Sequence, residues 1–161
     1  IQVFKTIKMR KDDEFWMGMA LKQAKVAFDE QEVPVGAVLV NSLTNQYFAS
    51  HNQSRQDFDP CAHAEILAIR KAAQTVKNYR LGDMILYTTL EPCVMCAGAI
   101  IQARITRIVF ATRDWVAGAA GSRLNVFYHP SSNHHIQIDE GVLHEEASAL
   151  LRQFFAEQRK K

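Results

Sequence analysis

The stretch Val35-Gly-Ala-Val-Leu-Val40 is apolar at every position and directly follows Pro34. Because neither face of this stretch carries a polar side chain, we expect a central strand that is covered on both sides. Upstream of Pro34, Trp16, Ala20 and Ala24 recur at helical spacing, which predicts a helix over residues 14–31. Asp12 and Asp13 precede this helix and can cap it.

Strands and helices alternate along the rest of the chain. We expect further strands at residues 47–50, 83–90, 107–112 and 135–139, and further helices at 62–76, from about Cys93, and at 145–159. This alternation predicts an α/β, three-layer sandwich with a five-stranded mixed, mostly parallel sheet that is covered by helices on both faces. Only the hairpin of strands 35–40 and 47–50 is expected to be antiparallel.

Composition restricts the classes of protein that the chain can belong to. Its 161 residues are 48% hydrophobic, which predicts one folded domain over residues 1–161, with residues 1–11 peripheral or flexible. The longest apolar stretches fall short of the ~20 residues that span a membrane, and no signal peptide is expected. The odd number of cysteines, three, favours a reducing, cytoplasmic location. A net charge of +2 permits a polyanionic partner without requiring one.

Two short motifs carry the residues suited to chemistry: His63-Ala-Glu65 and Pro92-Cys-Val-Met-Cys96. A helix that starts near Cys93 places both thiols at its positive end, which favours the thiolate. Two thiolates and one imidazole make a tetrahedral Zn²⁺ site with one open position, the catalytic arrangement. Glu65 can serve as the base beside it, provided that the neighbouring helix begins near His63.

Two non-catalytic interpretations compete with this one. The Cys-x-x-Cys pair alone fits a redox pair or half of a structural zinc knuckle. Alternatively, Cys61 could join His63 and the cysteine pair in a closed Cys₃His site. The spacing of Cys61 from His63 is tighter than usual for two ligands, and a closed site leaves Glu65 unexplained. We therefore expect the open site, with Cys61 as a small packed residue.

The two motifs together match the H-x-E…P-C-x-x-C signature of zinc nucleobase deaminases. From about Phe15 to Phe155 the chain resembles the bacterial tRNA adenosine deaminases, a family within the zinc-dependent cytidine/deoxycytidylate deaminase superfamily. The matching stretches are residues 32–40, His51-Asn52, 59–65, 90–99, 118–122 and Phe154-Phe155. The resemblance implies a cytidine deaminase-like fold, hydrolytic deamination of the wobble adenosine to inosine, one Zn²⁺ per chain, a tRNA anticodon stem-loop as partner, and a homodimer.

The resemblance also implies a role for individual residues. His63, Cys93 and Cys96 correspond to the zinc ligands, and Glu65 to the proton shuttle of the family. An asparagine amide, one donor group and one acceptor, suits the edge of a purine. The substrate contacts that the resemblance implies are Asn52, Val35, Ala64, Leu90, Glu91, Arg113, Asp114 and Phe155.

The sequence departs from the family at two positions that carry positive charge. Val116 stands where the family loop usually has lysine, and Gln53 where many relatives have arginine. Trp115 could instead stack on a base or pack at a subunit contact. These departures leave open a deaminase of a free base, nucleoside or nucleotide. A second alternative, a noncatalytic zinc-stabilised RNA-binding module, corresponds to the closed Cys₃His site.

Overall fold

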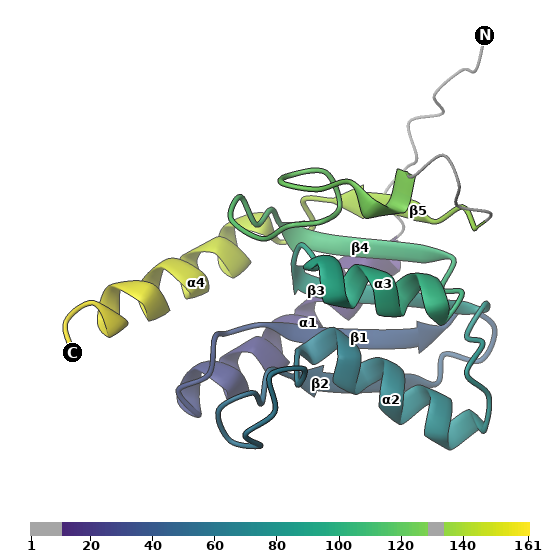
Figure 1. Cartoon of the computed structure of the whole chain (residues 1–161), viewed down its shortest axis with the longest axis horizontal. Coiled ribbons are helices and arrows are strands. Elements are labelled where there is room, and N and C mark those ends of the chain that lie inside the picture. The colour runs from purple at the N-terminus through teal and green to yellow at the C-terminus, as the bar shows by residue number, and fades with distance from the viewer. Residues whose placement is uncertain (1–10, 129–133) are drawn as a thin grey trace, which may run out of the picture.

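The structure is a computed structural model that describes residues 11–128 and 134–161. Residues 1–10, which make up nearly all of the segment expected to be peripheral, lie outside the described residues. Within these ranges no helix has the length and apolar character needed to cross a membrane. The elements, shown in Figure 1, are α1 (Lys11–Asp29), β1 (Gly36–Asn41), β2 (Tyr47–His51), α2 (Ala64–Val76), β3 (Met84–Leu90), α3 (Val94–Gln102), β4 (Arg107–Thr112), the short 3₁₀ turn η1 (Val126–Tyr128), β5 (Gln137–Glu140) and α4 (His144–Gln158).

The five strands form one mixed sheet in the order β2-β1-β3-β4-β5. Strands β3, β4 and β5 are parallel, whereas β1 is antiparallel to both β2 and β3. The fold class expected from the sequence is confirmed, but the expectation that only the first hairpin is antiparallel is wrong. After the crossover through α2, strand β3 runs in the same direction as β2. It pairs with the free edge of β1, and β1 runs in the opposite direction.

The sheet separates two apolar cores. Along β1, Ala37 and Leu39 face the core beneath α2 and α3, while Val38 and Val40 face the core beneath α1 and α4. In Figure 1, α2 and α3 lie in front of the sheet and α1 lies behind it. At Gly36 a Cβ atom would overlap the backbone of α1, so the close approach of this helix requires glycine there. The uniformly apolar strand is thus buried on both faces, as its sequence predicts.

Asp13 does not cap α1; the helix begins earlier, and Asp13 is buried within its first turn. Both of its carboxylate oxygens bind the Arg107 guanidinium, at 2.8 and 2.9 Å, and the Tyr87 hydroxyl donates to the same carboxylate at 2.8 Å. Arg107 also binds Asp139. This network ties α1 to strands β3, β4 and β5.

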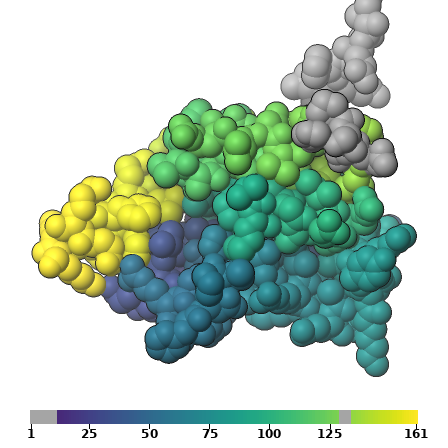
Figure 2. Space-filling view, viewed as in Figure 1, coloured from purple at the N-terminus to yellow at the C-terminus, as the bar shows by residue number. Residues whose placement is uncertain are grey.

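The helix starts and strand ends that matter for chemistry meet at one end of the sheet. There β3 and β4 end, α2 and α3 begin, and the loops 52–63 and 113–125 leave the sheet. In α/β folds, ligands bind at the carboxyl ends of parallel strands. Figure 2 shows α4, in yellow, projecting from the molecule at this same end.

Candidate active site

His63 owes its position to the start of α2. It is the N-cap residue of that helix, with an extended backbone at φ −77° and ψ 150°. The helix therefore begins at Ala64, after the histidine, and Glu65 occupies its first turn. Because His63 lies outside the helix, the angular separation that a regular helix imposes on residues two apart does not apply, and both side chains reach the same pocket.

Cys93 and Cys96 are positioned by α3 in the same way. Cys93 is the N-cap of α3, and Cys96 lies in the first turn, where it is completely buried. Hydrogen bonding from the neighbouring Cys96 thiol, and also from His63, lowers the pKa of Cys93 to about 4. This position therefore favours the thiolate, the form of cysteine that binds metals.

The geometry of these three residues fits a zinc ion. Nδ1 of His63 lies 3.6 Å from the sulfur of Cys93 and 3.6 Å from that of Cys96. Zn–S bonds of about 2.3 Å and Zn–N bonds of about 2.0–2.1 Å at a tetrahedral angle separate sulfur from nitrogen by about 3.6 Å. Among the residues that the structure describes, these three form the group of possible metal ligands, with all ligand atoms within 4.8 Å of one another.

Cys61 is not a member of this group. Its backbone N–H donates to Asp59 at 2.8 Å and its carbonyl accepts the N–H of His63, also at 2.8 Å, so the residue shapes the turn before α2. The closed Cys₃His alternative therefore lacks its fourth ligand, and the donor set that remains leaves one tetrahedral position to a non-protein ligand.

Glu65 lies beside the three ligands and is only 3% exposed. One carboxylate oxygen lies 3.6 Å from the Cys96 sulfur, and the other accepts a hydrogen bond from the Thr88 hydroxyl at 3.3 Å. Burial raises the pKa of Glu65 above its ordinary value, which suits a group that must take up and release a proton. Sequence reasoning missed Thr88, because a threonine in an apolar strand carries no signal of a site.

Asn52 lies at the end of β2, where it links the pocket to α2. Its side-chain oxygen accepts the backbone N–H of Ala64 at 2.8 Å, and its backbone N–H donates to the carbonyl of Val35 at 3.1 Å. Because a backbone N–H must face an acceptor, this contact fixes the amide orientation and turns the NH₂ group elsewhere. The amide hydrogens remain for a ligand, whereas the N–H of Ala64 is already used.

These residues open into a cavity of about 190 Å³. Its walls contain the zinc-site residues His63, Cys93 and Glu65 together with predicted substrate contacts. These predicted contacts are Asn52, Val35, Leu90, Glu91 and Asp114. Two further lining residues, Val33 and Ala117, were not among the predicted contacts. We call this cavity the base pocket, after the base that the resemblance predicts it to hold.

Two other predicted contacts lie in an adjoining apolar cavity of about 560 Å³, which shares Val33, Leu90, Asp114 and Ala117 with the base pocket. Arg113 and Phe155 line it together with Trp115. The Arg113 guanidinium binds Glu140 through two nitrogens, each at 2.8 Å, and lies 5.5 Å from the centre of the Trp115 ring. Ionic pairing therefore already engages the basic side chain that lines the adjoining cavity.

Comparisons with known proteins agree with this geometry. The family model described as the cytidine and deoxycytidylate deaminase zinc-binding region matches residues 10–112. The tRNA-specific adenosine deaminase of Haemophilus influenzae is 47% identical over 91% of this chain and 85% of its own length. That of Bacillus subtilis is 41% identical over 92% of each chain.

Solved structures with this fold extend the comparison. One, from a study of A-to-I editing by tRNA:A34 deaminases at the wobble position of transfer RNA, has a TM-score of 0.81 at 39% identity, covering 85% of this chain and 99% of the other. The guanine deaminase of Nitrosomonas europaea has a TM-score of 0.77 at 26% identity, covering 89% and 84%. The three-ligand cluster, the adjacent glutamate and these matches agree: the chain belongs to the zinc-binding cytidine and deoxycytidylate deaminase family, together with the tRNA-specific adenosine deaminases that it resembles.

Proposed function

We propose that this protein hydrolyses adenosine to inosine at the wobble position of a tRNA anticodon, with one Zn²⁺ per chain. The observation that carries the proposal is that Glu65 lies beside three possible metal ligands and lines the same pocket as Asn52. Relatives named tRNA-specific adenosine deaminase, identical at 38–47% of positions, support the choice of substrate.

His63, Cys93 and Cys96 would hold the zinc ion. When bound, zinc supplies Lewis acidity that activates water at neutral pH. Glu65 accepts one proton of the attacking water at its carboxylate and delivers it to N1 of the purine; it then accepts the remaining proton of the new C6 hydroxyl and delivers it to the departing amine. A C6–O bond forms, the C6–N bond breaks, and ammonia leaves. The buried carboxyl serves this cycle because burial makes its proton easier to retain between steps.

Asn52 and the apolar walls would bind the flipped base. The Asn52 amide hydrogens are free to donate to an acceptor on the purine edge, while Val35 and Leu90 pack against the ring. Bases in an anticodon loop are not paired, so turning one into the pocket costs little. The adjoining cavity, with Trp115 and Phe155 in its wall, would then accept a neighbouring nucleotide.

The direct test is formation of inosine in a purified anticodon stem-loop, with a stem-loop that carries guanosine at the wobble position as control. We expect inosine and ammonia in equal amounts. Affinity for the stem-loop should fall steeply with added salt because phosphate contacts release counterions. Ammonia released from free guanine or cytidine, without inosine in the stem-loop, would contradict the proposal and assign a small-molecule substrate.

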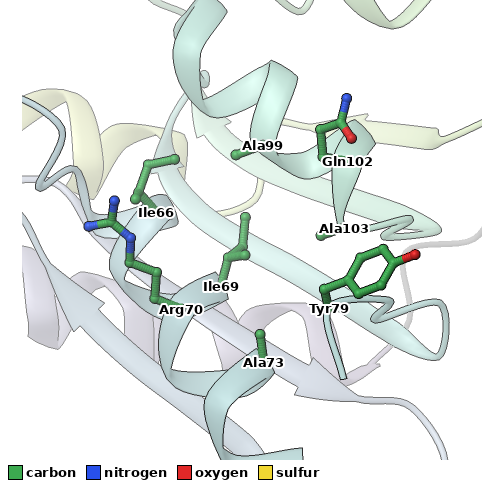
Figure 3. Close-up of a pocket in the computed structure, with 8 residues that line it drawn as sticks. All are labelled: Ile66, Ile69, Arg70, Ala73, Tyr79, Ala99, Gln102 and Ala103. Atoms are coloured by element: carbon green, nitrogen blue, oxygen red, sulfur yellow. The ribbon is translucent and has the colours of Figure 1, made fainter. Parts of the chain in front are cut away.

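The assembly proposed is a cytoplasmic homodimer, and the face assigned to the second copy is the apolar groove between α2 and α3. Figure 3 shows Ile66 and Ile69 of α2, Tyr79 and Ala103 around this groove of about 330 Å³. Tyr79 is 69% exposed in the single chain. Light scattering should give twice the chain mass, and Ile69→Arg should give the mass of one chain; a wild-type monomer would contradict this assembly.

A further inference from the structure

The side chain of Glu91 is buried and accepts hydrogen bonds from one loop, and the nearby Arg113 guanidinium interacts with it electrostatically. Glu91 is 2% exposed, and one carboxylate oxygen accepts the backbone N–H groups of Ala120 and Ser122 at 3.0 and 3.1 Å. The other oxygen accepts the backbone N–H of Asp114 at 3.0 Å and the Ser122 hydroxyl. These four bonds connect Glu91 to both ends of the segment 114–122, called the wall loop below.

The wall loop also contacts the segment that carries the metal ligands. Gly118 pairs with Cys93 in an isolated antiparallel bridge, and the N–H of Ala119 donates to the carbonyl of Pro92 at 2.9 Å. A Cβ atom at Gly118 would overlap the Glu91 carboxylate. Glycine at this position therefore allows the loop to close directly over the buried acid.

The opposite side of the wall loop faces substrate space. Asp114 and Ala117 line both the base pocket and the adjoining cavity, and Trp115 and Val116 line the adjoining cavity alone. The carboxylate of Asp114 is turned into the loop, where it accepts the N–H groups of Val116 and Ala117, each at 3.0 Å. The shape of this wall consequently depends on bonds within the loop and on the bonds that hold it from behind.

We propose that the Glu91 side chain is a positioning residue that fixes the wall loop and thereby sets the affinity for the nucleotides at and beside the target base. The inference rests on the proposed RNA substrate. Glu91 forms no side-chain hydrogen bond with Glu65 or the three ligands in the structure, so loosening the loop affects binding more than the chemical step.

Glu91→Gln tests this assignment because it preserves size and removes one acceptor. A glutamine presents an NH₂ group to one pair of loop donors, so at least the bond to Asp114 or the bonds to Ala120 and Ser122 are lost. Ser122→Ala removes only the hydroxyl bond and provides a milder variant that keeps the acid. Asp139→Asn is the matched control, an acid-to-amide change at a carboxylate that binds Arg107 away from the pocket.

Activity and loop order are measured together. KM for the stem-loop should rise about tenfold or more in Glu91→Gln and less in Ser122→Ala, with kcat within about threefold of wild type and zinc content unchanged. In a Trp16→Phe background, Trp115 is the remaining tryptophan. Quenching of its fluorescence by acrylamide should increase most in Glu91→Gln and less in Ser122→Ala. Asp139→Asn should change neither quantity.

Unchanged KM and quenching in Glu91→Gln would overturn the inference, and so would a fall in kcat that follows loss of zinc. If the wild-type protein makes no inosine in the stem-loop, the proposed function fails, but the quenching series still decides whether Glu91 orders the wall loop.

Discussion

The side-chain oxygen of Asn52 accepts the backbone N–H of Ala64 at 2.8 Å, so a residue of the base pocket also holds the first turn of α2. His63 precedes that turn and Glu65 belongs to it. Under the proposed function, Asn52 would therefore couple the contact with substrate to the position of a metal ligand and of the proton shuttle. Substitutions can separate these two roles.

Asn52→Asp keeps an oxygen for the Ala64 N–H and replaces the NH₂ donor by a second oxygen. We expect this variant to fold and retain zinc but to lose about 100-fold in kcat/KM, since a buried acceptor of the base then meets another acceptor. Asn52→Ala loses both roles and should in addition unfold at a lower urea concentration. Equal activity of Asn52→Asp and wild type would show that the amide hydrogens do not contact the base.

Glu65→Gln and Cys61→Ser distinguish an open catalytic zinc site from a closed structural one. Glutamine cannot cycle a proton, so Glu65→Gln should bind zinc and fold yet lose at least about 10³-fold in kcat. Cys61 lies outside the ligand group, so Cys61→Ser should keep both zinc and turnover. Zinc content by atomic absorption, measured beside initial rates, checks both. Loss of zinc from Cys61→Ser would contradict the three-ligand site.

The network on the α1 side of the sheet contributes stability without contacting the site. Arg107→Met leaves the buried Asp13 carboxylate without its guanidinium partner, which should cost about 3–5 kcal/mol in the free energy of unfolding. Adding Asp13→Asn removes the buried charge and should recover part of this loss, as a urea-unfolding double-mutant cycle would measure. The rate per folded molecule should not change, and a selective loss of kcat would contradict this separation.

Short-range patterns predicted the elements well, and they singled out the three side chains that the structure brings together as possible metal ligands. Strand β4 has the predicted bounds, 107–112. Its apolar run is uninterrupted and is flanked by arginines, so the sequence marks both ends of the strand. His63, Cys93 and Cys96 could be found because their motifs are local, even though the two motifs are thirty residues apart.

The relationships that the sequence did not reveal depend on partners far along the chain. The direction of β1 relative to β3 follows from the route of the α2 crossover, which no local pattern encodes. The local pattern around Asp13 predicts a helix cap. Its actual partner, Arg107, belongs to a distant strand, so no local pattern indicates the ion pair. The resemblance implies Glu91 only as a substrate contact, whereas its side chain binds a loop more than twenty residues later.

Tyr87 should make the stability of the fold depend on pH in the alkaline range. Burial, together with its hydrogen bond to Asp13, raises the pKa of Tyr87 above its ordinary value. A raised folded-state pKa leaves the contribution to stability intact below the unfolded-state value of about 10. Above it, unfolding releases the proton, so the free energy of unfolding should fall by up to about 1.4 kcal/mol for each pH unit. Tyr87→Phe should be less stable by about 1 kcal/mol at pH 8 and should show a shallower decline. Urea midpoints between pH 8 and 11 measure both, and parallel declines in the two proteins would assign the alkaline loss to other groups.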